Sequence, residues 1–318
     1  MKGSMEKGRA RRAVWNTWGQ YVAVAATYEA LYEITYHVSF PQFLLTTGLR
    51  LAFLLLLPTR FWPAIAIGES VPLLEHALFC VDKFGWAWAV LASIPTVALW
   101  APLLKALLDH WPLHDEHGRL RMPVILAATF STAIITASIT TLTLVAALQH
   151  APGKWPDLSP VSFFFSYALG GYLGALTLTP TLLALYERFR NTPMEAFSVA
   201  LLWRSRLFRD VICWVVPALA ALVWLAQTTG DDTVRQIARL ALLWPVIGLA
   251  RRHGWHGTAV GGMGASFALA LTARGLVDVM TLQVQLVLAV VLSAALLLGG
   301  RQQSTRAGIQ PAHPLPER

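Results

Sequence analysis

Charged side chains are scarce in this sequence. Only 13% of its 318 residues are Asp, Glu, Lys or Arg, and 56% are hydrophobic, whereas soluble domains are usually about a quarter charged. This shortage excludes an ordinary soluble domain, because many apolar runs approach the ~20 residues that a helix needs to cross a bilayer. The composition therefore predicts an all-α, polytopic integral membrane protein that is embedded in the lipid bilayer and has the lipids as partners.

Signatures of familiar chemistry are also missing. The sequence contains no phosphate-binding glycine loop, no nucleophile elbow and no zinc-protease motif. We therefore predict no enzymatic activity, no cofactor and no metal site. The two cysteines, Cys80 and Cys213, fall inside or near apolar runs, and we interpret them as small apolar residues and not as a disulfide.

The net charge of +8 does not indicate a nucleic-acid partner, because the basic residues lie between the apolar runs. Basic residues of membrane proteins concentrate in cytoplasmic loops. With the N-terminus inside and about ten transmembrane helices, only these basic residues fall in outer loops: Lys83, Lys154, Arg235 and Arg274. We therefore predict ten spans with both termini in the cytoplasm. Eight spans are the alternative, if the two shortest helices do not cross fully.

The sequence divides into a basic cytoplasmic N-terminus at 1–13, a membrane-embedded domain at 14–298 and a polar tail at 299–318, which we expect to be cytoplasmic and disordered. Within the membrane domain, residues 187–209 are expected to form a cytoplasmic interfacial helix whose basic side chains meet lipid head groups. The expected spans are 14–38, 42–57, 61–80, 85–108, 122–149, 161–186, 210–228, 234–250, 256–273 and 279–298.

One span carries more sequence information than the others, namely the run at 161–186. Gly170 and Gly174 stand four residues apart and so share a helix face, and a face of small residues lets a second backbone approach closely. Pro180 follows, and a proline inside a helix removes a backbone hydrogen bond and bends the helix. The hydroxyls of Thr177, Thr179 and Thr181 around it are expected to satisfy the freed carbonyls. The run is either a plain packing helix or a hinge and cavity wall.

Two charges are predicted to pair inside the membrane. Arg50 lies in the second expected span and Glu69 in the third, at nearly equal distances from the turn near Arg60. At ~1.5 Å rise per residue, antiparallel helices bring the two side chains to the same depth. A buried ion pair is weak evidence for stability by itself, because desolvation offsets much of its attraction.

Further ionisable residues suggest a polar cavity among the first three spans. Arg50, Glu29 and Glu69 are expected to form its floor, and His37, Glu75 and His76 are expected near its outer mouth. Glu33 shares a helix face with Glu29 and His37. Ionisable groups at bilayer depth are expensive and often functional. The alternative is a set of structural ion pairs and snorkelling ends. The candidate ligand-binding residues are Glu29, Glu33, His37, Arg50, Glu69, Glu75 and His76.

Four short stretches together resemble a known family. In chain order they are FPQFLLTTGLR (40–50), LPTRFWPAIAIG (57–68), GGYLGALTLTP (170–180) and LWPVIGLARRHG (243–254). They resemble the type-one MASE domain, a bacterial membrane-associated sensor, over about residues 14–298. The resemblance implies a multi-pass sensory module of the bacterial inner membrane, which in this family is usually fused to a cytoplasmic histidine kinase or diguanylate cyclase. It supplies no ligand residues.

No kinase or cyclase follows the last expected span, so we expect either a stand-alone sensor or one separated from its output domain. The leading hypothesis is a non-enzymatic sensor that binds an unknown small ligand and signals through a separate cytoplasmic protein. A secondary transporter or channel for a small solute or ion is the alternative, because buried charges and broken helices fit that class too. A membrane-embedded enzyme using His37 and Glu75 is weaker. The glycine faces permit a homo-oligomer without requiring one.

Overall fold

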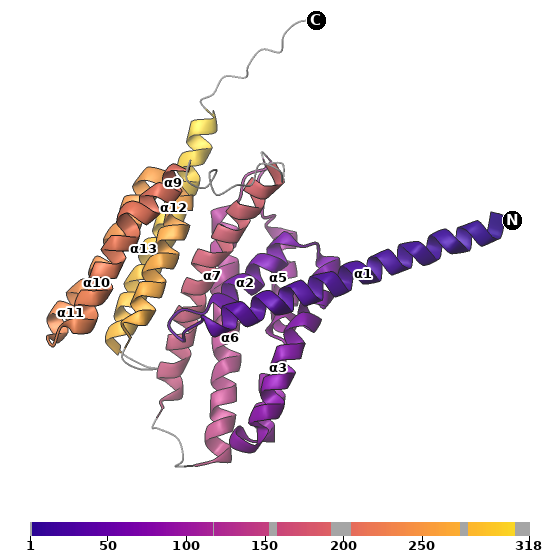
Figure 1. The fold of residues 1–318 in the computed structure, drawn as a ribbon, viewed down its shortest axis with the longest axis horizontal. Helices are drawn as coiled ribbons and strands as arrows, with labels where there is room; N and C mark the ends of the chain where they lie inside the picture. The colour runs from indigo at the N-terminus through magenta and orange to yellow at the C-terminus, as the bar shows by residue number, and fades with distance from the viewer. Residues whose placement is uncertain (1, 117, 153–157, 192–204, 274–278, 309–318) are drawn as a thin grey trace, which may run out of the picture.

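The computed structural model describes residues 2–116, 118–152, 158–191, 205–273 and 279–308, and it is built from helices (Figure 1). The first part of the chain contains α1 (Lys2–His37), α2 (Leu45–Leu56), the short η1 (Thr59–Phe61), α3 (Trp62–Phe84), α4 (Trp86–Ala92), α5 (Thr96–His110), α6 (Met122–His150) and α7 (Pro160–Asn191). The second part contains α9 (Arg206–Asp210), the π-helical turn η3 (Val211–Val215), α10 (Val216–Thr228), α11 (Asp232–Ala241), α12 (Leu243–Leu271) and α13 (Val279–Gly308).

Many of these helices are long and apolar enough to cross a bilayer. Among the described residues, six helical runs satisfy both conditions, and a seventh does so if α4 and α5, which are bent by 42° at a short break, form one span. Helix α2 is apolar but has only 12 residues. The chain is therefore a multi-pass membrane protein, as its composition predicts.

The longest of these runs, Asp232–Leu271, is folded back on itself at Gly254. This glycine has φ 61° and ψ −141°, a backbone conformation that does not occur inside an α-helix. Beyond it, the position of a Cβ on Gly257 would lie 2.3 Å from the carbonyl oxygen of Leu249, and one on Gly261 would lie 3.3 Å from Cα of Val246. Residues so far apart in sequence could not meet in one straight helix. The run therefore consists of two helical arms that fold back on each other at Gly254, which lies between the expected spans 234–250 and 256–273.

Replacing Gly254 with alanine should destabilise this corner. Its positive φ is reached at little cost only by glycine, and holding another residue in such a conformation costs about 1–3 kcal/mol. We expect Gly254→Ala to lower the thermal unfolding midpoint in detergent. Gly230→Ala is the matched control, because Gly230 has no atom within 4 Å of its Cβ position and no positive φ. Equal midpoints for the two variants would show that the corner does not need glycine.

Helix α7 lies at the centre of the molecule, between α2 and α6 on one side and α12 and α13 on the other (Figure 1). Its glycine face makes the close approach that the sequence predicts. A Cβ on Gly170 would lie 2.1 Å from the carbonyl oxygen of Pro41, and one on Gly174 would lie 1.9 Å from that of Leu44. The Leu44 amide also donates a hydrogen bond of 3.0 Å to the Gly170 carbonyl. The N-terminal end of α2 therefore packs directly against the backbone of α7.

The threonines around Pro180 behave differently from the prediction. The proline removes the bond to the carbonyl of Leu176. Only Thr181 bonds a carbonyl in the turn before the proline, donating to that of Thr177 at 2.7 Å, and the other two hydroxyls bond elsewhere. Thr177 donates to the Leu173 carbonyl at 2.8 Å, and Thr179 donates to the Gly48 carbonyl of α2 at 3.0 Å. The Thr179 bond therefore connects α7 to α2 instead of repairing α7.

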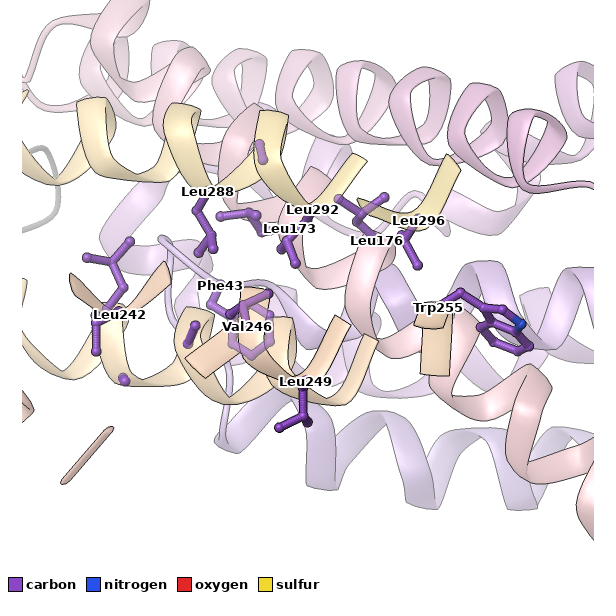
Figure 2. Close-up of a cluster of buried hydrophobic side chains, with 14 of the residues drawn as sticks. Phe43, Leu173, Leu176, Leu242, Val246, Leu249, Trp255, Leu288, Leu292 and Leu296 are labelled. Carbon is purple, nitrogen blue, oxygen red and sulfur yellow. The ribbon is translucent and has the colours of Figure 1, made fainter. Parts of the chain in front are cut away.

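Apolar side chains fill the space between α7 and the last helices. Figure 2 shows Leu173 and Leu176 of α7 beside Leu288 and Leu292 of α13, with residues of α12 nearby. All four leucines are buried. Burial of a leucine side chain in a close-packed core contributes a few kcal/mol in water, whereas inside a membrane the contribution comes from packing. This cluster joins the second part of the chain to α7.

Several helix ends differ from the expected spans. The span expected at 85–108 is broken into α4 and α5 around Pro95, because the residue before a proline is disfavoured in helical conformation. Helix α2 begins late, since residues before it form a bridge between Phe40 and Phe43. Helix α13 continues to Gly308, past the expected end at 298. Most of the interfacial helix expected at 187–209 lies outside the described residues, as does the tail from 309 onward.

Candidate ligand-binding site

The predicted ion pair between Arg50 and Glu69 is present. Arg50 is on α2 and Glu69 on α3, and the two side chains are 4% and 0% exposed. Both Nε and Nη2 of Arg50 donate to Oε1 of Glu69, Nε at 2.6 Å. The short turn around η1 sets both groups at one depth, which confirms the prediction made by counting residues from that turn.

The second oxygen of Glu69 makes a contact that the sequence did not predict. Oε2 accepts a hydrogen bond of 2.8 Å from the backbone N–H of Val97, in the first turn of α5. A carboxylate at a helix N-terminus satisfies an otherwise unbonded N–H and interacts favourably with the helix dipole. Glu69 therefore connects α2, α3 and the start of α5.

Aromatic rings surround the guanidinium. Its Cζ lies 4.9 Å from the ring centroid of Trp100 and 5.9 Å from that of Tyr32, within the range of cation–π attraction. Tyr28 and Trp100 are fully buried, and in the described part of the chain the Tyr28 hydroxyl and the Trp100 Nε1 have no hydrogen-bond partner. Sequence reasoning missed these residues, although Tyr28, Tyr32 and Tyr36 recur every four residues.

A cavity of about 650 Å³ lies beside the ion pair. Helices α1 to α7 and the segment before α2 all contribute to its walls. Arg50 lines it, together with Tyr32, Tyr36 and His37 of α1. The remaining lining residues are Ser39, Phe40, Pro41, Leu44, Thr46, Leu73, Phe84, Trp88, Leu91, Ala92, Ile94, Thr96, Thr136, Ile139, Thr140, Thr143, Leu144, Ala147, Phe163 and Tyr167.

Three of the predicted residues lie at or next to this cavity. Arg50 and His37 line it, and His37, whose side chain is 73% exposed, stands at its edge. His76 of α3 is exposed and does not line the cavity, but its ring centroid is 6.3 Å from that of Tyr36 and 5.9 Å from that of Trp88. Both of those aromatic residues line the cavity.

The four acidic candidates do not line the cavity. Glu69 is turned away into the ion pair, and Glu33 lies 3.5 Å from Nδ1 of His37. Glu29 is only partly buried and Glu75 is exposed. Glu29 is thus not at the cavity floor. Neither Glu29 nor Glu33 lines the cavity, although His37 does, and the α1 side chain that lies over the Arg50 guanidinium is Tyr32.

The other buried arginines have structural partners. Arg235 donates from Nε to the Ala226 carbonyl at 3.1 Å, and Arg239 donates from Nε to the Thr272 hydroxyl at 3.2 Å. Each side chain therefore bonds groups at the C-terminal end of a neighbouring helix, where cations are favourable. Arg50 differs from them because it lines the large cavity.

These features define an all-α membrane protein with a buried ion pair beside a cavity inside the helical bundle. The MASE1 family model matches residues 19–306, and the chain therefore belongs to the MASE1 family, as its motifs suggest. This is a family of membrane sensory domains and not a family of enzymes. No curated protein and no solved structure matches the chain.

Proposed function

We propose that this protein is a sensory module of the bacterial inner membrane that binds a small ligand in the cavity beside Arg50 and signals through a separate cytoplasmic partner. The observation that carries this proposal is a buried arginine, Arg50, that lines a cavity of about 650 Å³. Ligand pockets commonly have such volumes and combine mainly apolar walls with a few polar groups.

The same contacts suggest how binding is transmitted. Glu69 holds Arg50 of α2 and the Val97 amide of α5 at once, and α5 follows the break after α4. A ligand that binds one arrangement of these helices better than another shifts the population toward it. The signal in this proposal is a movement of α5 relative to α2 and α3.

For the topology, we propose ten crossings with both termini in the cytoplasm. The fold-back at Gly254 supports the count, because it divides one long helical run into two arms. The broken α4–α5 pair supplies one span, and the count also requires α1 and the short α2 to cross. The distribution of basic residues between loops supports the orientation.

A secondary transporter is the second candidate, and the broken span supports it. Transporters commonly bind solutes where a discontinuous helix presents its half-helix end at mid-membrane. Here α4 and α5 are bent by 42°, and the first turn of α5 meets the buried Glu69. Uptake into liposomes separates the two functions, because a sensor has no need to move its ligand.

A thermal-shift screen of the purified protein against small metabolites and ions tests ligand binding. We expect at least one compound to stabilise the protein, by ~2.7 kcal/mol at 100 times its dissociation constant. Thr140→Phe should abolish the shift, because Thr140 lines the cavity and the larger phenylalanine side chain would project into it and obstruct binding. Ser138→Phe on the exposed face of α6 should leave it intact.

A stabilising compound whose effect survives Thr140→Phe would place binding elsewhere and overturn the proposed site. No stabilising compound in a broad screen would overturn the ligand-binding function itself. Accumulation of the identified compound inside liposomes, lost in Thr140→Phe and kept in Ser138→Phe, would replace the sensor proposal with transport.

A further inference from the structure

The charges around the cavity favour one class of ligand. Among the described residues that line it there is no Asp or Glu, while Arg50 and His37 both do so. A cationic ligand would therefore find no carboxylate in the wall to bind, because Glu69 is directed at Arg50 and does not line the cavity. Resting on the proposed function, we propose that the ligand is a small organic monoanion, an aliphatic or aromatic carboxylate, bound through its carboxylate to Arg50.

The guanidinium retains bonding capacity for such a ligand. Nε and Nη2 of Arg50 both donate to one oxygen of Glu69, whereas Nη1 takes no part in the ion pair. A guanidinium has five N–H donors and remains charged at any physiological pH. It can therefore bind a second carboxylate on its other edge while the first stays in place. Because Glu69 does not line the cavity, the two carboxylates would approach from different sides.

Two buried threonines complete the polar end. Thr46 lies one helical turn before Arg50 on α2, and Thr96 is the first residue of α5; both line the cavity. Hydroxyls and helix N-termini are favourable neighbours for an anion. Elsewhere the wall carries many apolar and aromatic side chains, including Leu73, Phe84 and Trp88, and these suit an apolar body attached to the carboxylate.

In this proposal the ligand carboxylate and the Glu69 carboxylate both bind the Arg50 guanidinium. Glu69 therefore competes for the charge of Arg50 and lowers the affinity for the ligand. Removing the negative charge of Glu69 leaves the full charge of Arg50 to the ligand. Glu69→Gln should therefore bind carboxylates more tightly than the native protein, by about tenfold, the factor that corresponds to one charge-assisted hydrogen bond. Arg50→Met/Glu69→Met removes both charges together and should lose the preference for carboxylates.

The experiment is equilibrium titration of the full chain in detergent, at constant ionic strength, with two matched sets of probes. One set is benzoate, benzamide and benzylamine, and the other is hexanoate, hexanamide and hexylamine. We expect each carboxylate to bind at least about tenfold more tightly than its amide and amine, as for a charge-assisted contact. We expect the preference to disappear in Arg50→Met/Glu69→Met, whose folding is checked by its thermal unfolding midpoint.

Equal binding of acid and amide, tighter binding of an amine, a preference that survives in the double variant, or no binding of any carboxylate overturns the proposed ligand class. These outcomes are distinguishable from failure of the proposed function. A hit from the metabolite screen that Thr140→Phe abolishes keeps the cavity as a ligand site of another class. The absence of any such hit removes the site altogether.

Discussion

Glu69→Gln should lower the free energy of unfolding by about 3–5 kcal/mol, the usual effect of removing one partner from a buried ion pair. The Arg50 side chain is 4% exposed and that of Glu69 is fully buried, so the neutral amide would leave a cation without a counter-ion inside the bundle. The Gln side chain still has an oxygen that can accept from Val97, so the loss reports mainly on the charge. Reversible unfolding in mixed detergent micelles measures it.

Two further variants serve as controls for Glu69→Gln. Glu75→Gln on the same helix, α3, changes an exposed carboxylate and should alter stability by less than about 0.5 kcal/mol. Arg50→Met/Glu69→Met replaces both charges with apolar groups and should recover most of this loss, because no unpaired charge remains; the Val97 N–H, which then has no carboxylate to donate to, keeps a cost of about 1–3 kcal/mol. If Glu69→Gln and Glu75→Gln were equally stable, the pair would contribute nothing to folding.

The ion pair could be predicted from sequence because it depends only on local geometry. A short turn joins α2 and α3, so counting residues from that turn fixes the relative depth of Arg50 and Glu69. The same reasoning predicted the glycine contacts of α7, since spacing alone places Gly170 and Gly174 on one face. In both cases the helix rise or period was the only information required.

The rest of the site depends on helix rotation and on distant segments. Counting gives the depth of Glu29 but not the direction it faces, and the structure turns Tyr28 toward Arg50 instead. Depth and rotation are separate quantities, and rotation is set by packing of α1 on α3, where a Cβ on Gly68 would lie 2.4 Å from the Ala25 carbonyl. That contact joins residues from different helices, and the sequence periodicity of neither helix predicts it.

Pro95 is a local sequence signal for the break between α4 and α5, but no such signal indicates what the start of α5 contacts. A proline predicts a helix boundary, yet nothing nearby in sequence indicates that the new helix start is bonded by Glu69. The corner at Gly254 is similar: the glycine marks a boundary between spans, while its unusual ψ of −141° follows from the close contact of the two arms. Sequence therefore located the breaks, and tertiary packing determined what each break does.

Gly174→Ala should strongly destabilise the protein, although it adds only one methyl group. An added Cβ would lie 1.9 Å from the carbonyl oxygen of Leu44 and 2.5 Å from its carbonyl carbon. Backbone atoms cannot rotate away as a side chain can, so the start of α2 must move off α7. Overpacking of this kind costs about 3 kcal/mol or more at its upper end. We expect a correspondingly lower thermal unfolding midpoint in detergent.

Gly171→Ala is the matched control, because it adds the same methyl group to the same helix. Its Cβ would lie 3.6 Å from the Thr47 hydroxyl and 3.8 Å from Ala133, which are ordinary contacts, and alanine favours helix over glycine by about 1 kcal/mol. We expect Gly171→Ala to be at least as stable as the native protein. Because α2 also carries Arg50, Gly174→Ala should weaken ligand binding as well, whereas Gly171→Ala should not. Equal stability of the two variants would mean that α2 and α7 are not held in direct backbone contact.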